Sequence, residues 1–322
     1  MLKKDIGLLL LIVVVVVVVA LMNPLFLSPI NLGNTANLVG LFGIFAIGQA
    51  FVIITGGIEL SVGSVIALLG VLFVDLMVNH GIPWPLALVA MLLLGLLIGL
   101  VHGLFITRLH LQPFIITLCG LLIYRGVARF YTADATAGFG FGVSFPTLEW
   151  LTVGRFYGVP HSFIALVLIA AAMWVILHRS VFGRHLYAVG KSEEAARFSG
   201  IRTNGIIVAA YVICGGLTAI SAIFFAMYTR SISPSSHGNF YELYAIAAAV
   251  LGGFSLRGGE GSIVGVVLGA VLLQVLQNLV NLLGIPSSLN FAVMGSVILI
   301  GVLADTQYAE YRRRRAASRP LD

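Results

Sequence analysis

The chain has 322 residues, of which 60% are hydrophobic and only 9% are charged, and its mean hydropathy is +1.08. A soluble globular protein carries about 25% charged residues, so this composition excludes a water-exposed globular surface and indicates a membrane protein. The net charge of +6 does not indicate nucleic-acid binding, because the cations lie in loops and near one terminus, as membrane orientation requires.

Long apolar stretches recur along the sequence. Because a spanning helix needs about 20 apolar residues and must pair its own backbone groups, they predict helices, whereas a β-barrel would show short alternating segments. We therefore expect an all-α, polytopic membrane helix bundle of about ten transmembrane helices in a single domain, residues 1–322. The expected spans, in chain order, are 6–22, 36–55, a third that ends near 78, 86–106, 114–130, 161–177, 206–228, a short piece at 243–251, 263–283 and 291–303.

The first apolar run follows Lys3 and Lys4, as in a signal peptide. It is too long for the apolar region of a signal peptide and is followed by no A-x-A site, so we expect a retained span with its N-terminus inside. With an even number of spans, 14 of the 18 lysines and arginines then fall on the inner side, as the positive-inside rule requires. Both termini, including the basic tail 305–322, are therefore expected to be cytoplasmic.

Two glycine-rich segments, Gly56–Ser64 and Gly252–Ser262, are expected to interrupt helices. Each carries a carboxylate, Glu59 or Glu260, and a carboxylate at membrane depth is costly unless it is paired or hydrated. Each carboxylate therefore has two readings, a functional group in the pathway or a simple helix cap at the inner surface, and Arg257 is a local partner for Glu260. The two segments have similar sequences, which either a duplication of half of the chain or a shared composition explains.

The connection 131–160 is long, contains many aromatic residues and is expected on the outer side, where aromatics favour the membrane boundary. Such a segment is usually functional or a docking surface. Just before it, Arg125 and Arg129 end the fifth apolar run. They either reach to the outer surface or, in the case of Arg125, bond to another helix or line a pathway.

The segment 179–204 contains the longest charged interval between the spans. Ser192 is a candidate N-cap, Glu193 and Glu194 suit the positive end of a helix dipole, and Gly200 suits the position after the helix. We expect a compact helix of two to three turns on the cytoplasmic side, which either connects two spans as a solvated loop or docks a partner. GKS at 190–192 lacks the earlier glycine and the strand of a phosphate-binding loop, so no nucleotide site is expected.

Enzymatic chemistry has little support in the sequence. The seven histidines are scattered, no H-E-x-x-H or G-x-S-x-G motif occurs, and Cys119 and Cys214 fall in apolar runs, where we expect small core residues rather than a metal site. A nucleotide-driven process would therefore need a partner that binds the nucleotide.

Three motifs follow one another in the chain: GGIELSVGS at 56–64, GRHLYAVGKSEEAARFSGI at 183–201 and YELYAIAAAVLGGFSLRGGEGSIVG at 241–265. Together they resemble the permease subunits of bacterial ABC importers for monosaccharides of the ribose, xylose and galactofuranose type, which are related to branched-chain amino acid permeases. The resemblance extends to about Leu303. The sequence departs from the family pattern at three places, with Glu59 and Tyr244 where the family usually has Asp, and Lys191-Ser192 where Gly-Asn is frequent.

The resemblance implies a non-enzymatic transport subunit of the bacterial inner membrane that forms a homodimeric pore in the lipid. Cytoplasmic ATP-binding subunits would bind ATP and Mg, and a periplasmic sugar-binding protein would deliver the substrate to the connection 131–160. The implied ATPase-coupling loop comprises Arg184, Lys191, Ser192, Glu193, Glu194, Arg197 and Gly200. The candidates for the translocation pathway or its gate are Glu59, Ser61, Arg125, Glu242, Tyr244 and Glu260.

Two alternatives remain open at this point. The substrate of an ABC permease could be another small solute, such as a branched-chain amino acid. A self-contained secondary transporter or channel would need ionisable residues within its spans to couple an ion, and these spans contain few.

Overall fold

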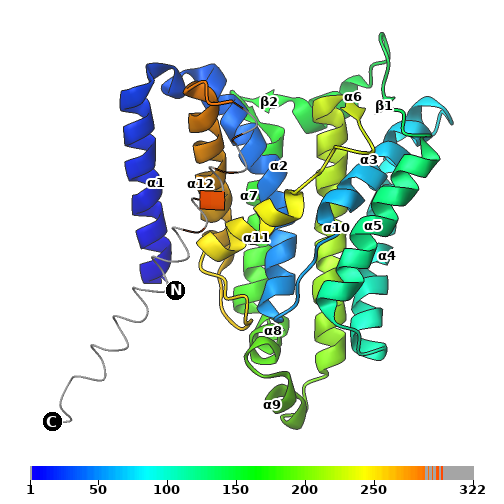
Figure 1. The fold of residues 1–322 in the computed structure, drawn as a ribbon, viewed down its shortest axis with the longest axis vertical. Coiled ribbons are helices and arrows are strands. Elements are labelled where there is room, and N and C mark those ends of the chain that lie inside the picture. The colour runs from blue at the N-terminus through cyan, green and yellow to red at the C-terminus, as the bar shows by residue number, and fades with distance from the viewer. Residues whose placement is uncertain (1, 287–288, 290–291, 293–294, 297–298, 300–322) are drawn as a thin grey trace.

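The computed structural model describes residues 2–286 together with 289, 292, 295–296 and 299, and these form a bundle of helices (Figure 1). The helices are α1 Leu2–Met22, the short 3-10 helix η1 Pro24–Leu27, α2 Pro29–Ile54, α3 Val62–Val78, α4 Trp84–Arg108, α5 Pro113–Tyr131, α6 Pro146–Val153, α7 His161–Arg179, α8 Val181–Lys191, α9 Glu193–Phe198, α10 Thr203–Thr229, α11 Tyr241–Leu251 and α12 Ile263–Leu282. Four two-residue strands form two small antiparallel pairs, β1 Ala137–Gly138 with β4 Ser231–Ile232, and β2 Arg155–Phe156 with β3 Val159–Pro160.

Seven of these helices, namely α1, α2, α4, α5, α7, α10 and α12, are long and apolar enough to cross a membrane. Two further apolar helices are shorter. At 1.5 Å per residue, α3 is about 25 Å long and α11 only about 16 Å, roughly half of a 30 Å hydrocarbon core. The structure confirms an all-α membrane bundle but not the expected count of ten spans. Most of the expected tenth span, 291–303, and the tail 305–322 lie outside the described residues.

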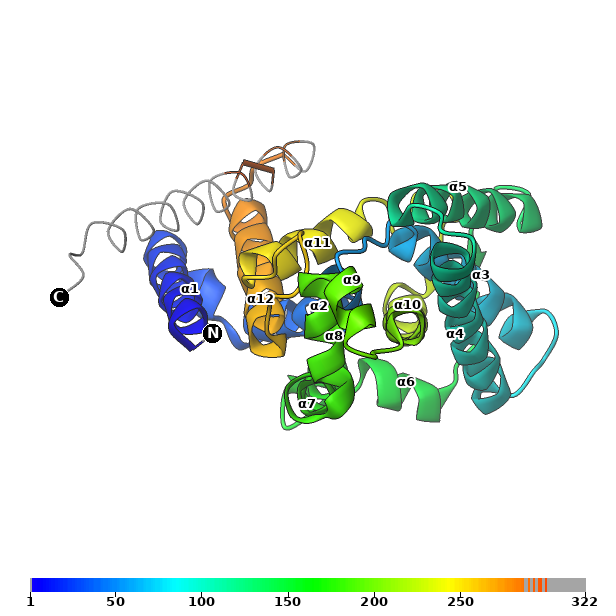
Figure 2. The same ribbon diagram turned by 90° about the horizontal axis from the view of Figure 1, so that it is seen from below.

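The centre of the bundle is formed by α2 and α10, which pack against each other. Helix α2 also contacts α7, α11 and α12, whereas α10 also contacts α3 and α4 (Figures 1 and 2). Helices α1, α5 and α7 lie at the perimeter and expose most of their apolar surface, as lipid-facing helices do. Cys119, expected in the core, is exposed on α5, whereas Cys214 on α10 is buried as expected.

Glycine allows the helices of the inner layer to approach closely. A Cβ at Gly99 of α4 would overlap the backbone carbonyl of Tyr211 on α10, and one at Gly215 of α10 would overlap that of Gly95. Small residues at helix contacts replace the hydrophobic driving force that is missing in lipid, because they bring backbones into van der Waals contact. These positions explain part of the high glycine content of the chain.

The bundle has two distinct ends. The α9 end carries α8, α9 and both breaks in the apolar helices, and the α6 end carries α6 and the strands (Figure 1). The connection expected as 131–160 forms the α6 end, where Arg230 donates to the Glu149 carboxylate over 2.7 Å and lowers the pKa of this carboxyl. The sequence reasoning did not predict α6, although Pro146 stands at its first turn, a usual place for proline.

Candidate translocation pathway and coupling segment

Residues 55–61 connect α2 to α3 without helical structure, as the glycines predict. The hydroxyl groups of Tyr211 and Thr117 donate to the Ile58 carbonyl over 3.1 and 3.4 Å. The amide of Gln49, oriented to satisfy both of its groups, pairs with the backbone N–H and C=O of Glu59 over 3.2 and 3.0 Å. Irregular backbone at membrane depth requires such partners, and here they come from α2, α5 and α10.

The Glu59 carboxylate is held inside the protein, with 5% of the residue exposed. Oε1 accepts hydrogen bonds from the Ser61 backbone N–H over 2.7 Å and from its hydroxyl group over 2.6 Å. Oε2 lies 2.7 Å from Nδ1 of His102 on α4. Glu59 therefore does not lie at the surface, because its carboxylate is buried at the start of α3 with three polar partners.

The hydrogen bonds continue from His102 to the next helix. The other ring nitrogen of His102, Nε2, lies 2.9 Å from the hydroxyl oxygen of Tyr124 on α5, so the chain Glu59–His102–Tyr124 links the break to α4 and α5. Sequence reasoning missed His102 and Tyr124. The available signal was a lone histidine within an apolar helix, since a polar ring at membrane depth requires partners.

Arg125 follows Tyr124 and binds the segment between α10 and α11. Its guanidinium donates to the backbone carbonyls of Pro234 and His237, over 2.9 and 2.7 Å, just before α11. Arg125 thus bonds to the connection between α10 and α11 rather than to another helix. Arg129, one turn later, is exposed and pairs with Asp134 over 2.6 Å, as expected of a residue at the surface.

Glu242 and Tyr244 lie on α11. Glu242 is buried in its first turn, and its carboxylate packs against Gly63 at the start of α3, where a Cβ would come within 2.8 Å of Oε2. Tyr244 is half-buried and its hydroxyl donates to Oε1 of Gln277 on α12 over 3.3 Å. Glu59 and Ser61 thus lie in the first break, whereas Arg125, Glu242 and Tyr244 lie on α5 and α11.

Glu260 differs from Glu59, because it lies at the surface of the α9 end. Its carboxylate pairs with Nζ of Lys191 over 2.6 Å, with both side chains more than half exposed. The sequence suggested Arg257 as a local partner, and the structure shows Lys191 as a partner of this carboxylate. The sixth pathway candidate therefore belongs to the junction between α8 and the second break rather than to the interior.

At this junction both breaks meet the end of α8. The Gly259 N–H donates to the Ile54 carbonyl over 2.8 Å, which joins the two breaks directly. A Cβ at Gly190 would overlap both the Ile54 carbonyl and the Gly259 backbone, and the Tyr187 hydroxyl donates to the Gly261 carbonyl over 2.7 Å. The end of α8 therefore contacts both breaks directly, through the backbone at Gly190 and the hydroxyl group of Tyr187.

The charged interval forms two helices rather than one. Ser180 caps α8 by accepting from the Gly183 N–H, and Ser192 caps α9 by accepting from the Ala195 N–H over 3.2 Å. Gly200 follows α9 with a positive φ of 83°, which glycine adopts without strain. Both predicted end signals are confirmed, but α9 has only six residues, fewer than the expected two to three turns.

The charged side chains of this interval have different surroundings. Glu193 pairs with Arg197 over 2.7 Å and accepts from the Thr203 hydroxyl over 3.2 Å, so it stabilises α9 itself. Arg184 and Glu194 are exposed. Phe198, which sequence reasoning missed, ends α9 with 85% of its side chain exposed. The exposed tip of α9 thus carries both charged groups and one large aromatic residue.

A polytopic bundle in which two interrupted helices meet near one surface has the architecture of a membrane transport protein. No group of three or more metal-ligating side chains occurs among the described residues. The family described as branched-chain amino acid transport system / permease component matches residues 31–302, and the chain belongs to this family.

Several curated relatives cover most of the chain. It is 39% identical over 286 residues to the ribose import permease protein of Bacillus subtilis, which covers 89% of this chain and 88% of the relative, and the Escherichia coli K12 ribose import permease protein matches to the same extent. The xylose transport system permease protein of Escherichia coli K12 is 32% identical over 338 residues, which covers 87% of this chain and 86% of the relative.

Proposed function

We propose that this chain is the membrane-spanning permease of an ATP-driven ABC importer that translocates a monosaccharide. The observation that carries this proposal is the relation over almost 90% of the chain to ribose import permease proteins, combined with the end of α8, which contacts both breaks. The alternative substrate, a branched-chain amino acid, is supported only by the description of the family.

The α9 end is the cytoplasmic face in this proposal. The cations Arg184, Lys191 and Arg197 lie there, as the positive-inside rule requires. By the same rule we place both termini on the cytoplasmic side. The exposed Glu194 and Phe198 on α9 are the groups available to a cytoplasmic ATP-binding subunit, which binds ATP and Mg. The coupling segment 179–204 then passes the movement of that subunit to the breaks through Gly190 and Tyr187.

The α6 end faces the periplasm in this proposal and receives the sugar-binding protein. Exposed aromatic side chains gather in the connection that forms this end, and aromatic residues are enriched at protein contact surfaces. They are Phe141, Trp150, Phe156 and Tyr157. A second copy of the chain completes the pore, and the exposed apolar surface of the perimeter helices offers room for that contact within the lipid.

The Glu59–His102–Tyr124 chain sets the conformation of the first break, and the Arg125 contacts set that of the segment before α11. Alternating access requires both segments to change conformation. In this proposal Glu59, Ser61, Arg125 and Glu242 position the protein groups that they contact. Separation of these contacts during the cycle opens the bundle toward one side of the membrane.

Purification of the importer tests this function. The chain, co-expressed with the ATP-binding subunit encoded beside it, is expected to co-purify with that subunit and to show ATP hydrolysis stimulated by sugar-loaded binding protein. Glu194→Arg is expected to reduce co-purification and stimulation together, while Asp134→Asn at the opposite end retains both. Uptake by the chain alone, driven by an ion gradient, would contradict the proposal.

A further inference from the structure

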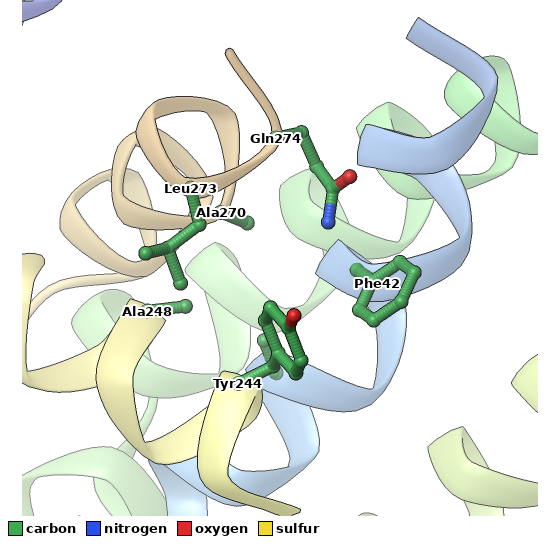
Figure 3. Close-up of a pocket in the computed structure, with 7 residues that line it drawn as sticks. Phe42, Tyr244, Ala248, Ala270, Leu273 and Gln274 are labelled. Carbon is green, nitrogen blue, oxygen red and sulfur yellow. The ribbon is translucent and has the colours of Figure 1, made fainter. Parts of the chain in front are cut away.

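A small cavity lies between α2, α11 and α12 (Figure 3). It is lined by Phe42 and Ala46 of α2, Tyr244 and Ala248 of α11, and Ala270, Leu273 and Gln274 of α12. Its volume is about 10 Å³, which is enough for one water molecule or one hydroxyl group. In this conformation the cavity is therefore closed to a whole sugar ring.

Gln274 gives the cavity its polar character. Only 4% of the residue is exposed, and its amide makes no hydrogen bond to any residue that the structure describes. Figure 3 shows the amide of Gln274 and the hydroxyl of Tyr244 directed into the same space. The cavity beside this amide has room for one water molecule or for one hydroxyl group of a ligand, and either group can hydrogen-bond to the amide.

Gln274 begins a row of amides on one face of α12. Gln274, Gln277, Asn278 and Asn281 recur at helical spacing, and we call them the amide track. Tyr244 donates to Gln277, and Asn278 exchanges two hydrogen bonds with Asn31 of α2, over 2.7 and 3.1 Å. Because α12 runs toward the α6 end, the track leads from the cavity to that surface (Figure 1).

The chemistry of the track fits an uncharged, hydroxyl-rich ligand. Each amide offers both donors and acceptors without charge, and the rings of Phe42 and Tyr244 provide the apolar faces that cover the C–H groups of a sugar. A zwitterionic amino acid would instead need opposite charges beside it. The ionisable groups described above inside the bundle do not line this cavity: they are Glu59, His102, Arg125 and Glu242.

We propose that the amide track with Tyr244 and Phe42 is the contact site for a monosaccharide as it crosses the bundle. The sugar enters when α11 and α12 separate, and its hydroxyl groups replace the missing partner of Gln274 and the Tyr244–Gln277 bond. This inference rests on the proposed function, because it assigns the substrate contacts of that same importer.

The test uses the complete importer, with its ATP-binding and sugar-binding subunits, in proteoliposomes with labelled D-ribose or D-xylose as probe. Gln274→Met keeps the length of the side chain but removes the amide, and is expected to lower uptake about tenfold, as for one lost hydrogen bond that leaves a polar partner unpaired. Stimulated ATP hydrolysis is expected to persist, so the number of sugars moved per ATP falls. Leu276→Met, on the same helix outside the track, serves as the matched control and retains both rates.

The outcomes separate the site from the function. Uptake by Gln274→Met at the control rate, with an unchanged ratio of sugar to ATP, overturns the site alone. Uptake of labelled L-leucine instead of either sugar by the unaltered importer overturns the proposed function together with the site. If Gln274→Met does not assemble, Tyr244→Phe carries the same test, because it removes a single hydroxyl group and is expected to lower the same ratio.

Discussion

The buried pair of Glu59 and His102 should be measurable as a coupling energy. His102→Ala removes the partner of Glu59, and Glu59→Gln removes the charge beside His102. The double variant combines both changes. Glu59 Oε2 and His102 Nδ1 lie 2.7 Å apart, with at most 7% of either side chain exposed. Removing one partner of a buried pair costs about 3–5 kcal/mol, because the remaining charge stays buried without compensation.

We therefore expect His102→Ala to lower the free energy of unfolding by about 3–5 kcal/mol. Glu59→Gln is expected to cost about 1–3 kcal/mol, since the amide oxygen still accepts from Ser61 but the charge is lost. The double variant should cost less than the sum by about 0.5–3 kcal/mol, because it leaves no unpaired carboxylate.

Reversible unfolding of the purified chain in mixed detergent micelles measures these three values. His80→Ala is the matched control, because His80 forms an exposed contact of 3.2 Å with Asp75, and it should change the free energy of unfolding by less than about 0.5 kcal/mol. If the costs of the two buried variants simply add, the pair does not hold the break, and the reasoning about Glu59 is refuted.

Three further predictions concern the contact between α8 and the breaks, helix α9 and the α6 end. Gly190→Ala should abolish sugar uptake while the chain still inserts, because its Cβ overlaps the Ile54 carbonyl, whereas Gly205→Ala, with open space around it, should keep normal uptake in the same proteoliposome assay. Glu193→Gln should destabilise α9 through the loss of its pair with Arg197 and lower stimulated ATP hydrolysis by about twofold, an effect of a few tenths of a kcal/mol; a full rate would contradict it. Arg230 lowers the pKa of the Glu149 carboxyl in the folded chain. The contact between the two side chains therefore stabilises the fold above the unfolded pKa of Glu149, about 4.3, and this contribution is lost as pH falls through the lower folded pKa. Thermal unfolding between pH 6 and about 3 should therefore show a steeper loss of Tm for the unaltered chain than for Glu149→Gln, and equal slopes would contradict this.

The sequence predicts features that depend on neighbouring residues. The apolar runs predict the long helices, and the glycines predict the breaks near Gly56 and Gly252, because hydrophobic length and backbone freedom are local properties. The same holds for the caps at Ser192 and Gly200, which the structure confirms.

Contacts between distant segments could not be predicted in this way. His102 is 43 residues from Glu59, and Lys191 is 69 residues from Glu260, so their pairing depends on how helices pack in three dimensions. The sequence assigned Glu59 and Glu260 the same two readings, yet one is buried beside a histidine and the other is exposed beside a lysine. Two motifs with similar sequences can therefore have different structural surroundings.

The amide track illustrates a signal that was present but not used. Gln274, Gln277 and Asn278 lie at helical spacing within an apolar run, and polar groups in such a run require a partner or a ligand. Their common face could have been derived from the spacing alone. The cavity at Gln274 and the facing Tyr244 required the packing of α11 against α12.

The central claim is that this chain forms the pore of an importer that depends on nucleotide hydrolysis in another subunit. Uptake of labelled D-ribose or D-xylose into proteoliposomes that contain the chain and its binding protein, with and without the ATP-binding subunit and ATP, tests this claim most directly. We predict uptake of one of these sugars only when both the ATP-binding subunit and hydrolysable ATP are present. Equal uptake without them would contradict the account.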